Sequence, residues 1–389
     1  MNMQYQMEFK KGLDNKNKDI NKNVEIKQDK TSINNQEEND NEEDNIPPYD
    51  FSKDKYENFE LNQIKELKSY KIQYEILGLE VLNDGRIFTT QKYRDEKGKK
   101  HYKLCVYSIE NEFICDINID FEEIKNIFKM DDGNIILYTN NQSIIIIKIK
   151  KNNYKEIMKL EDISEIKRLS NNRFYIYLKQ KTGKMLQAAW FAGGKALPEY
   201  EYHRCIYLYE KGKFILEKTL TDIYKKENIL DICLINENKY IFFSREKIAL
   251  LGEYDFLKFY DVTTNQITKK LKIGKKDQYN YEYHDMFYAG GDNLILQRPL
   301  MTGDKFILID INNKNIKKEY DYTINPKECF YLNDKTFLTN SSGDVYLYEF
   351  EDNNNIKLKD VKNNWCFSIQ KYPGNKLIRC SNNTISLFA

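Results

Sequence analysis

The chain has 389 residues, and its 61 Lys and Arg residues almost balance 60 Asp and Glu residues, giving a formal net charge of +1. That balance argues against a protein drawn to nucleic acid or membranes by its overall charge. No stretch approaches the roughly 20 apolar residues that span a bilayer, and no apolar run near the first residue is typical of a signal peptide. Seven scattered cysteines without a C-x-x-C pair indicate reduced thiols, so we expect a cytoplasmic or nuclear protein.

Residues 1–55 are rich in Lys, Asn, Asp, Glu and Gln and almost free of large apolar side chains. Such a segment buries too little apolar surface to offset the entropy lost on ordering, so we expect a disordered, charged tail. Its charge is segregated, because the stretch from Glu37 to Asp50 carries acids and no base. The tail either only solvates the protein or carries a short motif at Tyr5–Leu13 that folds on a partner.

From residue 56 to residue 389 two strand patterns recur, each seven times. In the first, an apolar strand ends in a polar turn that opens the next strand, and the residues after the turns are Arg86, Asn134, Arg173, Lys239, Asn293, Thr336 and Lys376. In the second, a strand alternates apolar residues and ends on a bulky residue, namely Tyr107, Ile147, Tyr209, Tyr260, Ile309, Tyr348 and Phe388. A strand-rich repeat of about 40 residues is typical of a β-propeller.

A charge-rich outer strand follows six of the seven repeats, and the last repeat ends at its third strand, TISLFA. The missing strand is predicted at Asn58–Leu67, just before the first inner strand. Pairing these two segments covers the open sheet edge. The fold class is therefore all-β, a seven-bladed β-propeller closed by an N-terminal outer strand, with a non-closing solenoid as the alternative.

The second pattern resembles the WD-repeat family, whose third strand ends in an apolar-any-apolar-Trp-Asp sequence. Only Asp261 and Asp310 keep the Asp, and the Gly-His dipeptide of that family is absent. The resemblance covers roughly Tyr56 to Ala389. It implies the propeller fold and a habit of binding proteins, and it implies no individual site residue.

Loops sort onto two faces of such a ring. Turns between first and second strands, and between third and fourth strands, are short and polar, whereas every insertion falls on the opposite face. The largest insertion, Lys179–Cys205, is either a binding loop or a hairpin packed onto the ring. The others are Gln91–Lys103, Ser244–Asp255, Gln297–Lys305 and the crossover Gly274–Asp285.

Long loops that carry aromatic and basic residues on a rigid scaffold are where binding is usually found. We therefore expect a non-catalytic protein-interaction scaffold, within a multi-subunit complex and without a cofactor, that binds partners through the insertion-bearing face. The candidate partner-binding residues are Trp190, Phe191, Tyr200, Tyr202, Arg245, Tyr279, Tyr281 and Arg298.

Two other functions stay open. One is a hydrolase or lyase at the channel mouth that uses Asp231, Asp285 and a histidine, although no phosphate-binding, nucleophile-elbow or zinc-protease motif occurs. The other is a phosphoinositide or RNA reader that uses the basic and aromatic loops. His101, His203 and His284 all fall on the insertion-bearing face, but they share no metal-ligand spacing, so no metal site is predicted.

Overall fold

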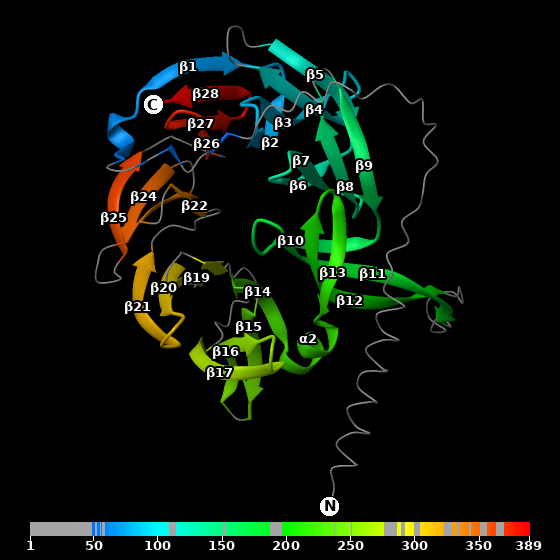
Figure 1. Cartoon of the computed structure of the whole chain (residues 1–389), viewed down its shortest axis with the longest axis vertical. Helices are drawn as coiled ribbons and strands as arrows, with labels where there is room; N and C mark the ends of the chain where they lie inside the picture. Colours follow the sequence, from blue (N-terminus) through cyan, green and yellow to red (C-terminus); the bar gives the residue numbers. More distant parts are fainter. Residues whose placement is uncertain are drawn as a thin grey trace, which may run out of the picture.

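The computed structural model describes residues 49–50, 53–54, 56, 59–108, 114–150, 153–186, 197–236, 238–249, 251–275, 286–288, 292–298, 304–322, 329–332, 335–341, 344–350, 356–362 and 369–389. Its strands form seven antiparallel sheets of four strands, arranged as a ring (Figure 1). The prediction of a seven-bladed β-propeller is therefore confirmed. The prediction of a tail at residues 1–55 lies largely outside the described residues.

The blades are numbered in the order in which they occur along the chain, and the strands of each blade are given from the innermost to the outermost. Blade 1 contains β2 (Glu75–Val81), β3 (Ile87–Arg94), β4 (Lys100–Ser108) and β5 (Ile114–Phe121). Blade 2 contains β6 (Ile124–Lys129), β7 (Asn134–Thr139), β8 (Ile144–Ile149) and β9 (Tyr154–Leu160). Blade 3 contains β10 (Ile163–Arg168), β11 (Arg173–Leu186), β12 (Leu197–Glu210) and β13 (Lys213–Thr219). Blade 4 contains β14 (Ile229–Asn236), β15 (Lys239–Ile248), β16 (Gly252–Asp261) and β17 (Gln266–Lys275).

The remaining blades follow the same order. Blade 5 contains β18 (Met286–Tyr288), β19 (Asn293–Arg298), β20 (Asp304–Asp310) and β21 (Asn315–Tyr322). Blade 6 contains β22 (Cys329–Tyr331), β23 (Thr336–Ser341), β24 (Asp344–Phe350) and β25 (Ile356–Lys362). Blade 7 contains β26 (Ile369–Tyr372), β27 (Lys376–Ser381), β28 (Thr384–Phe388) and, as its outermost strand, β1 (Glu66–Lys71).

Closure of the ring by an N-terminal strand is confirmed, but the predicted position of that strand, Asn58–Leu67, is wrong. The pairing strand is β1, which runs antiparallel to β28 with Tyr70 opposite Ile385. The preceding residues instead form a 3₁₀ turn, η2 (Leu61–Gln63), because Leu61 is fully buried against residues of blade 6 and cannot alternate along a sheet edge. The backbone N–H and the side-chain amide of Asn62 both donate to the carboxylate of Asp360 and hold this turn against β25.

Each sheet buries both faces against its neighbours, which explains the strand composition. Along β11, Phe174 and Ile176 pack with residues of blade 2, whereas Tyr175, between them, packs with residues of blade 4. Successive side chains of a strand point to opposite faces, so the core consists of apolar layers between blades. A middle strand such as β7 is therefore buried throughout, while β17 on the outside is mostly exposed.

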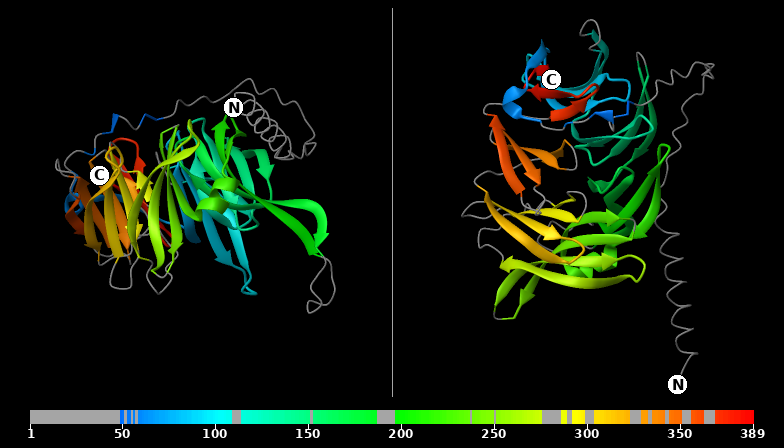
Figure 2. Two further views of the ribbon diagram at one scale, coloured as in Figure 1. Left: turned by 90° about the horizontal axis from the view of Figure 1, so that it is seen from below. Right: turned by 60° about the vertical axis from the view of Figure 1, so that its left-hand side comes forward.

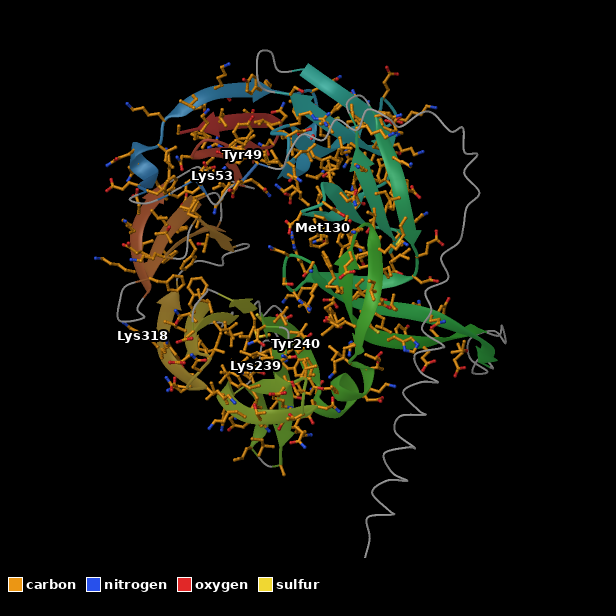
Figure 3. The ribbon with its side chains drawn as sticks, in the orientation of Figure 1. Tyr49, Lys53, Met130, Lys239, Tyr240 and Lys318 are labelled. Atoms are coloured by element: carbon orange, nitrogen blue, oxygen red, sulfur yellow. The ribbon has the colours of Figure 1, made fainter. Side chains whose placement is uncertain are left out.

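A second contact crosses the seam between blades 7 and 1. The backbone N–H of Tyr49 donates to the carbonyl of Asn83 in blade 1 at 3.2 Å, and its hydroxyl accepts from the N–H of Gly374 in blade 7 at 2.9 Å. The same hydroxyl donates to Asp54 at 2.8 Å. Figure 3 places Tyr49 near this seam. Residues just before β1 thus bridge the two blades that the closing strand joins, and Tyr49 belongs to the segment for which a tail was predicted.

Tyrosines at the bulky position of the repeat hold polar turns with their hydroxyls. Tyr209 of blade 3 donates to Asp132 at 2.9 Å and accepts from Nδ2 of Asn134 at 2.8 Å, both in blade 2. Burial is the main reason that the pKa of Tyr209 is raised, so this phenol stays a hydrogen-bond donor at neutral pH. The tyrosine therefore links two blades by polar contacts at the edge of their shared core.

We expect Tyr209→Phe to lower the free energy of unfolding by about 1 to 2 kcal/mol, because Asn134 is buried and loses a partner. Urea denaturation measures the change. Tyr202→Phe is the matched control, since Tyr202 is 42% exposed and should tolerate the loss of its hydroxyl. Equal stability of the Tyr209 variant and the wild type would contradict a structural role for the inter-blade bonds.

Candidate functional site

The described parts of the segment Lys179–Cys205 are the paired strands of a β-hairpin. Strands β11 and β12 stay paired from Arg173 opposite Leu208 to Leu186 opposite Leu197. Their neighbours in the blade stop earlier, because β10 pairs β11 only up to Leu178 and β13 pairs β12 only from Cys205. The two strands therefore continue alone beyond the ring, and the left view of Figure 2 shows the hairpin as the element that projects farthest from the body.

One face of this hairpin combines aromatic rings with cations. Cross-strand partners share a face, which places Tyr177 beside Arg204 and Lys179 beside Tyr202. The guanidinium of Arg204 lies 4.4 Å from the centroid of the Tyr177 ring, and Nζ of Lys179 lies 4.1 Å from that of Tyr200. Tyr177 and Tyr202 are tilted against each other at 5.7 Å. We call these five residues the hairpin face.

Blade 4 presents a second surface of the same kind, made by β16 and β17. Nζ of Lys272 lies 3.7 Å from the centroid of the Tyr254 ring, and Nζ of Lys270 lies 4.0 Å from that of Phe256. Lys270 is also bonded to Glu246. We call Tyr254, Phe256, Lys270 and Lys272 the blade 4 face. Its lysine ammonium groups lie at cation–π distance from aromatic rings.

The two faces border the same inter-blade layer. The hairpin face continues along its strands into Tyr175, and the blade 4 face continues along β16 into Tyr260, and both tyrosines belong to the core between blades 3 and 4. The short helix α2 (Thr221–Glu227), which connects the two blades, contacts β12, β14 and β15. In Figure 1, α2 lies between the hairpin and blade 4.

A buried lysine lies below the two faces. Lys258 is 1% exposed, and its Nζ lies 2.7 Å from a carboxylate oxygen of Glu227 at the end of α2 and 2.6 Å from one of Glu246 on β15. Burial raises the pKa of Glu246, but hydrogen bonds from Lys258 and Lys270 lower it more, so the pKa falls below its usual value. This network fixes α2 to blade 4 and keeps both carboxylates occupied.

The predicted site residues fall into three groups. Tyr200 and Tyr202 lie together on the hairpin face. Arg245 lies on β15 and its guanidinium donates to Asp255, which is 1% exposed, at 2.8 Å, so this arginine is held within blade 4. Trp190, Phe191, Tyr279 and Tyr281 lie outside the described residues, and Arg298 ends β19 with a side chain that is also outside them.

Sequence reasoning missed the ring-side half of this site. Lys179 and Arg204 lie at the two ends of the predicted insertion Lys179–Cys205, and Tyr254 lies in the insertion Ser244–Asp255, but none of them was selected as a site residue. Tyr177 and Lys272 lie outside the predicted insertions, in segments typical of ordinary propeller strands. The available signal was the alternation of aromatic and basic residues, Tyr175, Tyr177 and Lys179 in one strand and Tyr200, Tyr202 and Arg204 in the next. That pattern places all of them on one face of a hairpin.

Asp231, a candidate catalytic residue if the protein were a hydrolase or lyase, forms an ion pair. Asp231 on β14 accepts from Nζ of Lys167 on β10 at 2.6 and 2.8 Å, and its side chain is 13% exposed. Burial, and then the charge of Asp231, raise the pKa of Glu165 nearby. This pair joins the innermost strands of blades 3 and 4. Asp285 lies outside the described residues.

The histidines are distributed over the ring. Nε2 of His101 in blade 1 lies 2.9 Å from Asp95, and Nε2 of His203 in blade 3 lies 3.7 Å from Glu201, whereas His284 lies outside the described residues. Within the part of the chain that the structure describes, no three or more His, Cys, Asp or Glu side chains are grouped so that they could hold a metal ion. The same part contains no helix long and apolar enough to cross a membrane.

The ring resembles known propellers in structure and not in sequence. No family model and no curated protein sequence matches the chain. The Saccharomyces cerevisiae protein Sqt1 matches with a TM-score of 0.51 at 10% identity, over 83% of this chain and 98% of Sqt1. The WD40 β-propeller domain of Doa1 matches with a TM-score of 0.48 at 9% identity, over 84% of this chain and 96% of that domain. An acylaminoacyl peptidase of Pyrococcus horikoshii matches with a TM-score of 0.46 at 13% identity, over 79% of this chain and 48% of the peptidase.

The propeller fold that the WD-repeat resemblance implied is thereby confirmed. Identities this low show the fold alone. The function must therefore be argued from the residues of this chain, above all from the hairpin of β11 and β12 that projects from the ring.

Proposed function

We propose that the protein is an interaction scaffold that binds protein partners through the insertion-bearing face of its propeller, with the blade 3 hairpin as the principal contact. The observation that carries the proposal is the projection of β11 and β12 beyond the strands that flank them, with aromatic and basic side chains along one face. Partly exposed tyrosines on a rigid element are typical contact residues, because they bury a large area at a small cost in conformational entropy.

The projecting hairpin adds little to the stability of the ring, which favours a role in binding. A two-stranded ribbon beyond its sheet has little core of its own, and both of its edges leave backbone groups open to pairing. Within the proposal, Tyr200 and Tyr202 contact the partner directly, and the predicted residues Trp190, Phe191, Tyr279, Tyr281 and Arg298 extend the contact. Arg245 supports the surface through its bond to Asp255.

The test is affinity purification from native lysate with the intact chain and with a variant in which residues 181–200 are replaced by an Asn-Gly turn. This replacement keeps Gln180 paired with Glu201, so a two-residue turn closes the shortened hairpin. We expect the variant to lose a dominant partner, identified by mass spectrometry, while its melting curve stays close to that of the intact chain.

The matched control shortens the hairpin of blade 1, which lies on the same face. There an Asn-Gly turn replaces residues 95–99, between Arg94 and its pair Lys100. We expect this control to keep the partner. Recovery of the same partners by all three proteins would overturn the proposal that the blade 3 hairpin is the contact.

A further inference from the structure

We propose that the hairpin face and the blade 4 face together bind an acidic protein segment, which lies over α2 between blades 3 and 4. This inference rests on the proposed function and adds the chemistry of the partner and a second wall to the site. Its basis is that two elements from different blades, far apart in the sequence, present the same pairing of aromatic rings and cations to one inter-blade space.

The charges of the two faces favour an anionic partner. Five cationic side chains lie on or just below these faces, namely Lys179, Arg204, Lys258, Lys270 and Lys272. The carboxylates of the network below them, Glu227 and Glu246, are both bonded to the buried Lys258. The exposed side of α2 adds one acid, Asp222, and one base, Lys225, which balance each other. Positive charge is therefore in excess where a partner would dock, and Coulomb attraction at such a surface steers and orients an acidic chain.

Two of these cations are available to a partner. Among the described residues, Lys179 and Lys272 contact the rings of Tyr200 and Tyr254 and form no ion pair with a carboxylate. A cation over an aromatic face keeps its outward side open to an anion, so a carboxylate can approach the ammonium group while an apolar neighbour packs against the edge of the ring. The geometry thus suits a segment in which Asp and Glu alternate with apolar residues.

The pattern favours protein over nucleic acid as the source of the negative charge. Tyr177 and Tyr202 are packed against each other, and Arg204 and Lys179 lie over the rings of Tyr177 and Tyr200. Bases of single-stranded nucleic acid need aromatic faces on which to stack. On the hairpin face, these faces are already engaged.

The test uses fluorescence anisotropy with the full chain and a fluorescein-labelled synthetic peptide in which Asp and Glu alternate with Leu. The matched peptide carries Asn and Gln in place of the acids, and a labelled oligouridylate is the nucleic-acid probe. We expect the acidic peptide to bind at least about tenfold more tightly than the amide peptide, and its affinity to fall as salt is added.

The decisive variant is Lys179→Glu with Lys272→Glu, which should weaken the acidic peptide by about tenfold or more. Lys68→Glu with Lys155→Glu changes the charge equally on the outer strands of blades 7 and 2 and should bind as the wild type does. Melting curves confirm that both variants are folded.

Three results would overturn the inference: equal binding of the acidic and amide peptides, unchanged binding by the Lys179 and Lys272 variant, or tighter binding of oligouridylate than of the acidic peptide. Failure of the proposed function is a separate outcome. The variant in which residues 181–200 are replaced keeps both Lys179 and Lys272. The lysate experiment and the peptide experiment therefore test different residues, and either one can fail while the other succeeds.

Discussion

A variant that lacks residues 56–71 is expected to lose its cooperative unfolding transition or to aggregate on expression. The deletion removes three buried apolar side chains, Tyr56, Leu61 and Ile64, each worth about 1.5 to 3 kcal/mol. It also exposes the edge of β28 along its full length. The sum approaches the 5 to 15 kcal/mol that typically separates a folded domain from its unfolded state, so little stability is left.

Circular dichroism melting and size-exclusion chromatography measure this effect. The control lacks residues 1–48, because Tyr49 already bonds to the turns of blades 1 and 7 and should be kept. We expect the control to melt as the intact chain does. A deletion of residues 56–71 that stays monomeric with an unchanged melting temperature would show that the ring needs neither the closing strand nor the apolar anchors before it.

The second large effect concerns the buried Lys258. The double substitution Glu227→Gln with Glu246→Gln leaves this ammonium group without a countercharge at 1% exposure, and we expect the free energy of unfolding to fall by about 3 to 5 kcal/mol. Lys258→Met is the matched control, since it removes the buried charge and keeps a similar volume. A smaller loss is expected there, because Glu227 and Glu246 reach water at 19% and 30% exposure.

The same network predicts a pH dependence. The pKa of Glu246 is lower in the folded than in the unfolded protein, so its contribution to stability is complete above the unfolded value near 4.5 and is lost as the pH falls through the folded value. Denaturant titrations between neutral pH and pH 3 should show a steeper decline for the intact chain than for the Glu227 and Glu246 double variant. Parallel curves, or equal stability of the double variant at pH 7, would contradict this account of Lys258.

The repeat made the fold accessible to sequence reasoning. Residues such as Arg86 and Lys376 follow turns that every blade needs, so the pattern recurs wherever a second strand begins. The closing strand was misplaced because its pairing depends on β28, and nothing local distinguishes Leu61, which enters the core, from Leu67, which is 49% exposed on β1. Register between distant strands is a property of the assembled ring and is not written in either strand alone.

Only half of the candidate site could be predicted from the sequence, for a similar reason. Tyr200 and Tyr202 attracted attention because they belong to an insertion, but Lys179 and Lys272 acquire meaning only when two blades are side by side. The burial of Lys258 could not have been predicted, because the repeat pattern accepts any residue at this position of the strand. In addition, lysine is almost never fully buried without a partner. Its partners come from a helix and a different strand.

The seam has a consequence for how the chain is made. The hydroxyl groups of Ser69 in β1 and Ser386 in β28 lie 2.9 Å apart although 317 positions separate them in the sequence. At ribosomal rates of roughly 5 to 20 residues per second, β1 therefore waits roughly 15 to 60 s for its partner to be translated. During that time blades 1 to 6 can assemble from neighbouring strands, and Leu61 can pack against blade 6, but β1 has no sheet edge to join. In a nascent chain stalled before β28 the ring is therefore open, and the backbone groups of β1 that pair with β28 in the closed ring are exposed to pairing with other chains.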